Sequence, residues 1–279
     1  MKKRFKAKEY NITKTGVRFA TSDSDLQFVF DRCEELCAKN IHEIAGMRVM
    51  QEGAKYRGVW LETQPMAGEM YAKAKENMSP DALDNSWSGA IQGLSVQRSL
   101  DALLNYGHHE EAQMIGKKWL ANLCRKKYFT QQYNPVTGEH AKADDGYGPT
   151  MLAALQYIAY LYGVDFVRDE LIWSTVQDKN ESMYTQTLFG DEYANIHKNG
   201  VATAYKNGKK LFSVTCGVRV YTDLDGTPKR LVGMSEKSVH AAFEYGETAQ
   251  ELDVAPNSVY TFDGEKFVFC EQIPFDYNE

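Results

Sequence analysis

Residues 201–216 read VATAYKNGKKLFSVTC, in which the apolar residues recur with a period of two on both sides of Asn207-Gly208. Asn-Gly suits the two-residue turn of a β-hairpin, because both central positions of that turn need positive φ. The same arrangement recurs around Asp225-Gly226 in VRVYTDLDGTPKRLVG and around Asp263-Gly264 in VYTFDGEKFVFC. Three hairpin signals predict an antiparallel sheet, packed as a small sandwich on the rest of the chain.

Before about residue 175 the apolar residues recur instead at the spacing of amphipathic helices. A helix capped by Asp23 or Ser24 would bury one apolar stripe, namely Leu26, Val29, Phe30, Cys33, Leu36 and Cys37. Four more helices are expected near 64–78, over 89–105, from Glu110 onward, and from Pro149 to Gly163. The third and fourth would form an αα-hairpin across the link Tyr106–His109.

These two patterns predict an α+β fold with two domains. Residues 1–175 would form an α-hairpin domain, and residues 176–279 an antiparallel β domain.

Composition narrows the classes of function. The chain has 279 residues and a formal net charge of -6, which argues against nucleic acid as a partner. No apolar run approaches the roughly 18 residues that span a bilayer, and the basic opening MKKRFKAKEY lacks the apolar core of a secretory signal. The five scattered cysteines indicate free thiols in a reducing compartment, so a cytoplasmic location is predicted.

The sequence offers no cofactor or metal motif. Cys33 and Cys37 lie one helical turn apart, but no second Cys/His pair follows at zinc spacing. His108 and His109 are adjacent, so on a helix they would point about 100° apart and could not easily share a metal. No Gly-rich phosphate loop links a strand to a helix.

Three predicted loops, each just before a helix, combine aromatic side chains with hydrogen-bonding groups. They contain GVWLETQ, NSWSGAIQ and QQYNPVTGEHAKADDGYG, and together they could line one sugar site. The predicted sugar contacts are Arg57, Trp60, Glu62, Gln64, Trp87, Gln92, Gln132, Tyr133 and Tyr147. Alternatively, each Trp packs in the core, and Asp144 and Asp145 only cap the following helix.

YNPVTGE followed by GYGPTMLAAL resembles a segment of the inverting glycoside hydrolases with a six-hairpin (α/α)6 barrel. These are the relatives of trehalase, processing α-glucosidase and mannosylglycerate hydrolase. GVWLETQ and NSWSGAIQ resemble two further segments of that family, in the same order, so that the resemblance covers about residues 50–165. It implies a small carbohydrate substrate, such as an α-linked glucoside, and inverting acid/base hydrolysis without a cofactor.

The chain departs from this family in two places. Inverting hydrolysis needs a general acid and a general base. The resemblance puts the base just before the Tyr-Asn-Pro turn, where this chain has Gln131-Gln132, and glutamine cannot take a proton from water at neutral pH. Glu139, Asp144 or Asp145 is the expected substitute in the same loop.

The second departure is that the sequence predicts no central hairpins of the barrel, since about five helices are expected where a complete barrel has twelve. The chain would then be a shortened homologue, or its barrel would be completed by a second copy in a homo-oligomer. The alternative function is a non-catalytic carbohydrate-binding or assembly protein derived from a glycosidase.

Overall fold

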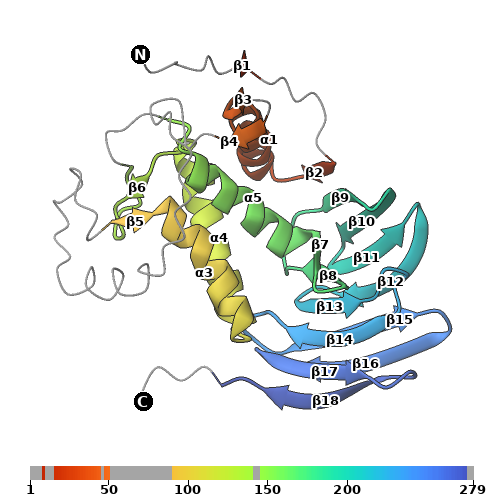
Figure 1. Ribbon diagram of the computed structural model, residues 1–279. Helices are drawn as coiled ribbons and strands as arrows, with labels where there is room; N and C mark the ends of the chain where they lie inside the picture. Colours follow the sequence, from red (N-terminus) through yellow and green to blue (C-terminus); the bar gives the residue numbers. More distant parts are fainter. Residues whose placement is uncertain (1–7, 10–15, 45–46, 51–89, 141–144, 275–279) are drawn as a thin grey trace, which may run out of the picture. The chain divides into compact units, whose positions relative to one another are not determined.

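The computed structural model describes residues 8–9, 16–44, 47–50, 90–140 and 145–274 (Figure 1). The chain divides into two compact units, each assembled from separate segments. The first unit comprises Met1–Lys14, Phe28–Leu100 and Trp119–Gln156, and the second comprises Thr15–Gln27, Asp101–Lys118 and Tyr157–Glu279. The two-domain division at residue 175 stays a prediction.

Four helices are present in the described residues: α1 (Ser24–Lys39), α3 (Gly93–Asn105), α4 (His109–Lys126) and α5 (Gly148–Tyr162). Four of the five predicted helices are thereby confirmed, and the one expected near 64–78 lies outside the described residues. The Asp23 carboxylate caps α1, since its Oδ1 accepts hydrogen bonds from the N–H groups of Asp25 and Leu26, each at 3.0 Å.

The predicted apolar stripe of α1 is buried except for Leu36, which is half-buried. All five cysteines are free thiols, and Cys33, Cys37 and Cys216 are buried, whereas Cys270 is exposed.

The strands form two large antiparallel sheets. One has the order β16-β15-β12-β11-β10-β9-β2 and the other β18-β17-β14-β13-β8-β7 (Figure 1). The strands of the first are β2 (Val17–Thr21), β9 (Ser182–Leu188), β10 (Asp191–Lys198), β11 (Val201–Lys206), β12 (Lys209–Thr215), β15 (Val239–Tyr245) and β16 (Thr248–Val254). Those of the second are β7 (Val164–Val167), β8 (Glu170–Thr175), β13 (Val218–Thr222), β14 (Pro228–Gly233), β17 (Ser258–Phe262) and β18 (Phe267–Gln272).

Two small sheets complete the described strands. The first joins β1 (Lys8–Glu9), β3 (Ile41–Ile44) and β4 (Met47–Met50), and the second pairs β5 (Ile91–Gln92) with β6 (Gln132–Tyr133). The coarse prediction of a mixed α and antiparallel β fold is confirmed. Strand β2 precedes the helices in the chain and pairs with β9, so the first large sheet is not built from C-terminal residues alone.

Aromatic side chains join the two large sheets. The Trp173 ring on β8 meets the edges of Tyr193 on β10 and Phe212 on β12, at centroid distances of 6.1 and 5.6 Å. Phe243 on β15 and Phe267 on β18 make a similar contact at 4.8 Å. The two sheets therefore pack face to face over an aromatic core.

The turn predictions are partly wrong. Asn207 and Gly208 have φ of 49° and 77° and form the two-residue turn expected between β11 and β12. Wider loops span 223–227 and 263–266 instead, because carboxylate oxygens of Asp223 and Asp263 accept hydrogen bonds from backbone N–H groups further along each loop.

Candidate functional site

The pairing of β5 with β6 brings two of the predicted sugar loops together. Gln92 faces Gln132 and Ile91 faces Tyr133 in the antiparallel register, so that the last two residues of NSWSGAIQ lie beside Gln132-Tyr133 of QQYNPVTGE (Figure 1). The Gly93 N–H also donates to the Gln131 carbonyl at 3.1 Å. Both segments belong to the first compact unit.

The segment GYGPTM meets the same place through Thr150, in the first turn of α5. A Cβ added to Gly93 would lie 1.9 Å from Thr150 Oγ1 and 2.9 Å from Thr150 Cα, so the two helix starts touch at a residue without a side chain. Thr150 Oγ1 donates to the Thr130 carbonyl at 2.6 Å. We call Gln92, Gly93, residues 130–133 and Thr150 the β5–β6 corner.

Two polar side chains at this corner lack hydrogen-bond partners in the part of the chain that the structure describes. Gln92 is 8% exposed, and neither its Oε1 nor its Nε2 has a hydrogen-bond partner among the described residues. The buried Oγ1 of Thr130 is likewise unpaired within the described part of the chain. Because buried polar groups are nearly always hydrogen-bonded, these atoms can accept or donate to a ligand.

Trp119 also lies beside the loop, although no sequence pattern indicated a role at this site. Its ring meets the edge of Tyr133 at 5.1 Å, and its buried Nε1 has no acceptor in the described chain. Because Trp119 lies on the apolar face of the helix expected from Glu110 onward, the helical pattern predicted only that it packs in the core.

Tyr133 and Tyr147 are both buried. The Tyr133 hydroxyl donates to the Tyr128 carbonyl at 2.6 Å and accepts from the Thr130 N–H at 3.1 Å. Burial raises the pKa of this phenol well above its ordinary value. Tyr133 therefore holds residues 128–133 in shape, and its ring has no exposed face in this structure.

The turn after Tyr133 is tight, as predicted. Asn134 Oδ1 accepts from the N–H groups of Val136 and Thr137, at 2.8 and 3.0 Å, and the Asn134 N–H donates to the Glu139 carbonyl at 2.7 Å. The loop thus has a defined shape, which a binding site requires.

Both candidate carboxylates in the described residues already have protein partners. Glu139 has an exposed side chain, and its ion pair with Lys126 lowers the pKa of its carboxyl group. Asp145 Oδ1 accepts from the N–H groups of Phe129 and Gly146, at 2.8 and 3.0 Å, which ties the GYG segment to the start of the loop. Arg32 Nη2 lies 3.9 Å from the other carboxylate oxygen of Asp145.

The remaining predicted site residues lie outside the described residues. They are Arg57, Trp60, Glu62, Gln64, Trp87 and Asp144.

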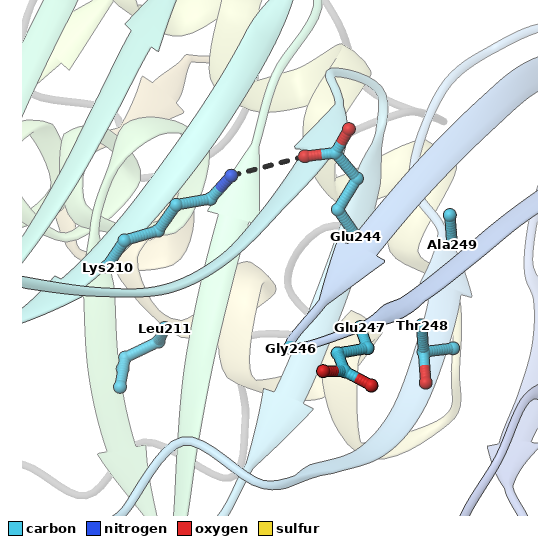
Figure 2. Close-up of a pocket in the computed structure, with 7 residues that line it drawn as sticks. All are labelled: Lys210, Leu211, Glu244, Gly246, Glu247, Thr248 and Ala249. Carbon is cyan, nitrogen blue, oxygen red and sulfur yellow. Dashed lines mark hydrogen bonds and ion pairs between the residues drawn. The ribbon is translucent and has the colours of Figure 1, made fainter.

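A separate hollow of about 380 Å³ opens beside β12, β15 and β16 in the second unit. Figure 2 shows Lys210 and Glu244 pointing toward one another across it, with Nζ and Oε2 at 3.2 Å. Glu244 also accepts from Ser213 Oγ at 2.8 Å, and this bond, followed by Lys210, lowers the pKa of its carboxyl group. No predicted sugar contact lines this hollow.

The described residues contain no group of three or more His, Cys, Asp or Glu side chains placed to hold a metal ion. None of the described helices is both long and apolar enough to cross a membrane.

No family model, curated protein or solved structure matches this chain.

Proposed function

We propose that this chain is a glycoside hydrolase-like protein that binds an α-linked glucoside or a related sugar at the β5–β6 corner. The observation that carries the proposal is the buried Gln92 amide, which has no hydrogen-bond partner among the described residues and lies beside Gln132 on a paired strand. The resemblance of three segments to six-hairpin glycosidases supplies the class of ligand.

The chemistry of the corner suits sugar hydroxyls. A primary amide has two donors and a carbonyl acceptor, and a sugar hydroxyl can both donate and accept, so neighbouring hydroxyls can pair with one amide. Thr130 Oγ1 and the Trp119 N–H add further unpaired groups in the described residues. Leaving a buried polar group unpaired costs about 1–3 kcal/mol, which a bound ligand would recover.

Hydrolysis would follow the inverting mechanism. A carboxylate takes a proton from water as the water attacks the anomeric carbon, and a carboxylic acid protonates the departing oxygen. The lowered pKa of Glu139 keeps it ionised near neutral pH, which suits the base and not the acid. Asp144 and Asp145 are the other proposed catalytic carboxylates.

One observation favours the second candidate, a non-catalytic sugar-binding or assembly protein. Glu139 and Asp145 are both engaged by protein groups, and Gln131-Gln132 stands where the related enzymes carry their base. Under either function, we propose that the chain descends from a partial (α/α)6 barrel followed by a β-sandwich. We also propose that it is cytoplasmic and forms a homo-oligomer.

Calorimetric titration with α-linked disaccharides and aryl glycosides tests the binding. Gln92→Leu keeps the approximate size of the side chain and removes its amide, so affinity should fall by roughly 10–100-fold, the equivalent of one or two hydrogen bonds. Gln97→Leu, on helix α3 directly after Gln92, is the matched control and should bind as the parent does. Failure of every sugar to bind, or equal affinity in all three proteins, would overturn the proposal.

Sugar release distinguishes the two candidates. If the parent hydrolyses a glycoside and Asp145→Asn or Glu139→Gln does not, the chain is an enzyme and the variant identifies a carboxylate that it needs. Binding without release at any pH between about 4 and 9 supports the non-catalytic alternative.

A further inference from the structure

Arg219, on β13 in the second unit, is a buried cation without an anionic partner in the described part of the chain. It is only 3% exposed, and its Nε is buried without an acceptor among the residues that the structure describes. Among the described residues its side chain makes neither an ion pair nor a hydrogen bond, and its guanidinium group lies against two aromatic rings. Its Cζ lies 4.5 Å from the ring centre of Tyr160 and 5.8 Å from that of Tyr221.

A guanidinium group stays charged at every pH that a folded protein tolerates, and it carries five N–H donors. Burying such a charge is costly unless it is paired and hydrogen-bonded. Cation–π contacts with two rings do not replace the lost hydration of a buried cation. Within the described chain, the environment of Arg219 therefore lacks a hydrogen-bond acceptor for this cation.

The neighbouring groups do not provide this acceptor. Arg230 lies 4.3 Å from the ring centre of Tyr221 and is itself paired with Glu170. The buried carboxylate of Glu111 is also engaged, since it contacts His108 Nδ1 at 3.0 Å and accepts from Asn257 Nδ2 at 2.9 Å. No acidic group of the described chain lies within 4 Å of the Arg219 guanidinium.

His109 does not neutralise the positive charge of Arg219. Its imidazole is buried, and burial, followed by the charges of Arg219 and Arg230, lowers its pKa well below the ordinary value, so it is neutral near pH 7. Its Nδ1 has no hydrogen-bond partner in the described residues. The backbone carbonyl of His109 accepts from the Tyr160 hydroxyl at 2.8 Å, which fixes the ring against which Arg219 packs.

We propose that Arg219 binds a small oxyanion, the phosphate or carboxylate group of a small molecule, through parallel hydrogen bonds from its guanidinium group. The planar fork of an arginine matches two oxygens of such a group, and Tyr160 and Tyr221 hold the fork in place. All of these residues belong to the second unit, whereas the β5–β6 corner belongs to the first, so the anion site does not depend on the proposed sugar site.

Thermal unfolding of the full chain tests the proposal. Phosphate, sulfate and acetate are each titrated at constant ionic strength, with chloride as the reference anion. A specific oxyanion should raise the Tm with saturation, by about 5–10 °C at roughly 100 times its Kd. The anion that saturates distinguishes phosphate from carboxylate chemistry.

Arg219→Met should abolish this shift. Arg18→Met is the matched control, because Arg18 is an exposed arginine of the same unit whose partner is Glu192, and it should keep the full shift. An equal shift in Arg219→Met and the parent, or no shift in the parent with any oxyanion, would overturn the proposal.

If Arg219→Met does not fold, calorimetry of oxyanion binding to Arg219→Lys provides a second test. Arg219→Lys retains the charge but loses the planar fork, so calorimetry should show at least about tenfold weaker oxyanion binding than in the parent. Equal affinity in the two proteins, or no binding heat in the parent, would refute an anion site at Arg219.

Discussion

Replacing Gly93 with alanine tests whether the β5–β6 corner is built as described. The added Cβ would lie 1.9 Å from Thr150 Oγ1 and 2.9 Å from both Cα and Cβ of Thr150. Rotating the threonine side chain can move Oγ1 but cannot move Cα, so the first turns of α3 and α5 must separate. Gly93 does not have positive φ, so the cost comes from this collision and not from backbone strain.

The magnitude follows from two effects. Overpacking a buried contact costs about 1–3 kcal/mol. Separation also weakens the buried bond from Thr150 Oγ1 to the Thr130 carbonyl, which contributes about 1 kcal/mol more. We expect Gly93→Ala to lower the free energy of unfolding by about 2–4 kcal/mol and the Tm by about 4–16 °C.

Urea unfolding of the full chain, followed by tryptophan fluorescence, measures this change. Gly16→Ala is the control, because its added Cβ would approach Thr187 Cβ no closer than 3.6 Å, an ordinary contact. Its stability should remain within about 0.5 kcal/mol of the parent. A Gly93→Ala variant as stable as Gly16→Ala would refute the close approach of the two helix starts. A folded Gly93→Ala variant should also bind sugar more weakly, since Gly93 adjoins Gln92.

Three further predictions concern the second unit. Burial lowers the pKa of His197 to about 4, so this imidazole takes up a proton near pH 6.5 in the unfolded chain but only near pH 4 in the folded chain. The free energy of unfolding should therefore fall by about 3 kcal/mol between pH 7 and pH 4, and His197→Gln should remove this decrease. Trp173→Ala should cost about 3–5 kcal/mol in urea unfolding, because the ring is fully buried and its Nε1 donates to Thr222 Oγ1 at 3.0 Å. When the native chain reacts with a thiol reagent and the reaction is monitored by absorbance, the exposed Cys270 should react in a fast phase, before the buried Cys216, whose pKa is raised by burial to about 12. Cys270→Ser should remove this fast phase.

Each of these three predictions would be contradicted by a specific result. The same pH slope in His197→Gln and the parent would mean that the imidazole protonates equally in both states. A loss of less than about 1 kcal/mol in Trp173→Ala would argue against the aromatic core between the sheets. A fast phase that survives in Cys270→Ser would mean that another thiol is open to the reagent.

Short-range rules accounted for the local elements of this protein. The α1 cap depends on Asp23 and residues within the next turn, and the Asn207-Gly208 turn depends on two adjacent residues that tolerate positive φ. The Arg168-Asp169 turn between β7 and β8 shows the limit of such rules. Both residues have positive φ without a glycine, because the pairing of the flanking strands holds them there.

The amino-acid sequence alone determined the helices with strong periodicity, the antiparallel hairpins and the tight turn after Tyr133, since each depends on neighbours along the chain. Only the tertiary structure decided that Gln92 lies beside Gln132, that Tyr133 is buried and that Asp145 binds the backbone of Phe129. It also decided that Arg219 is buried without a counter-ion among the described residues. The physical reason is that burial and pairing depend on groups distant in sequence, and the side-chain pattern of a single segment does not record which distant surface will cover it.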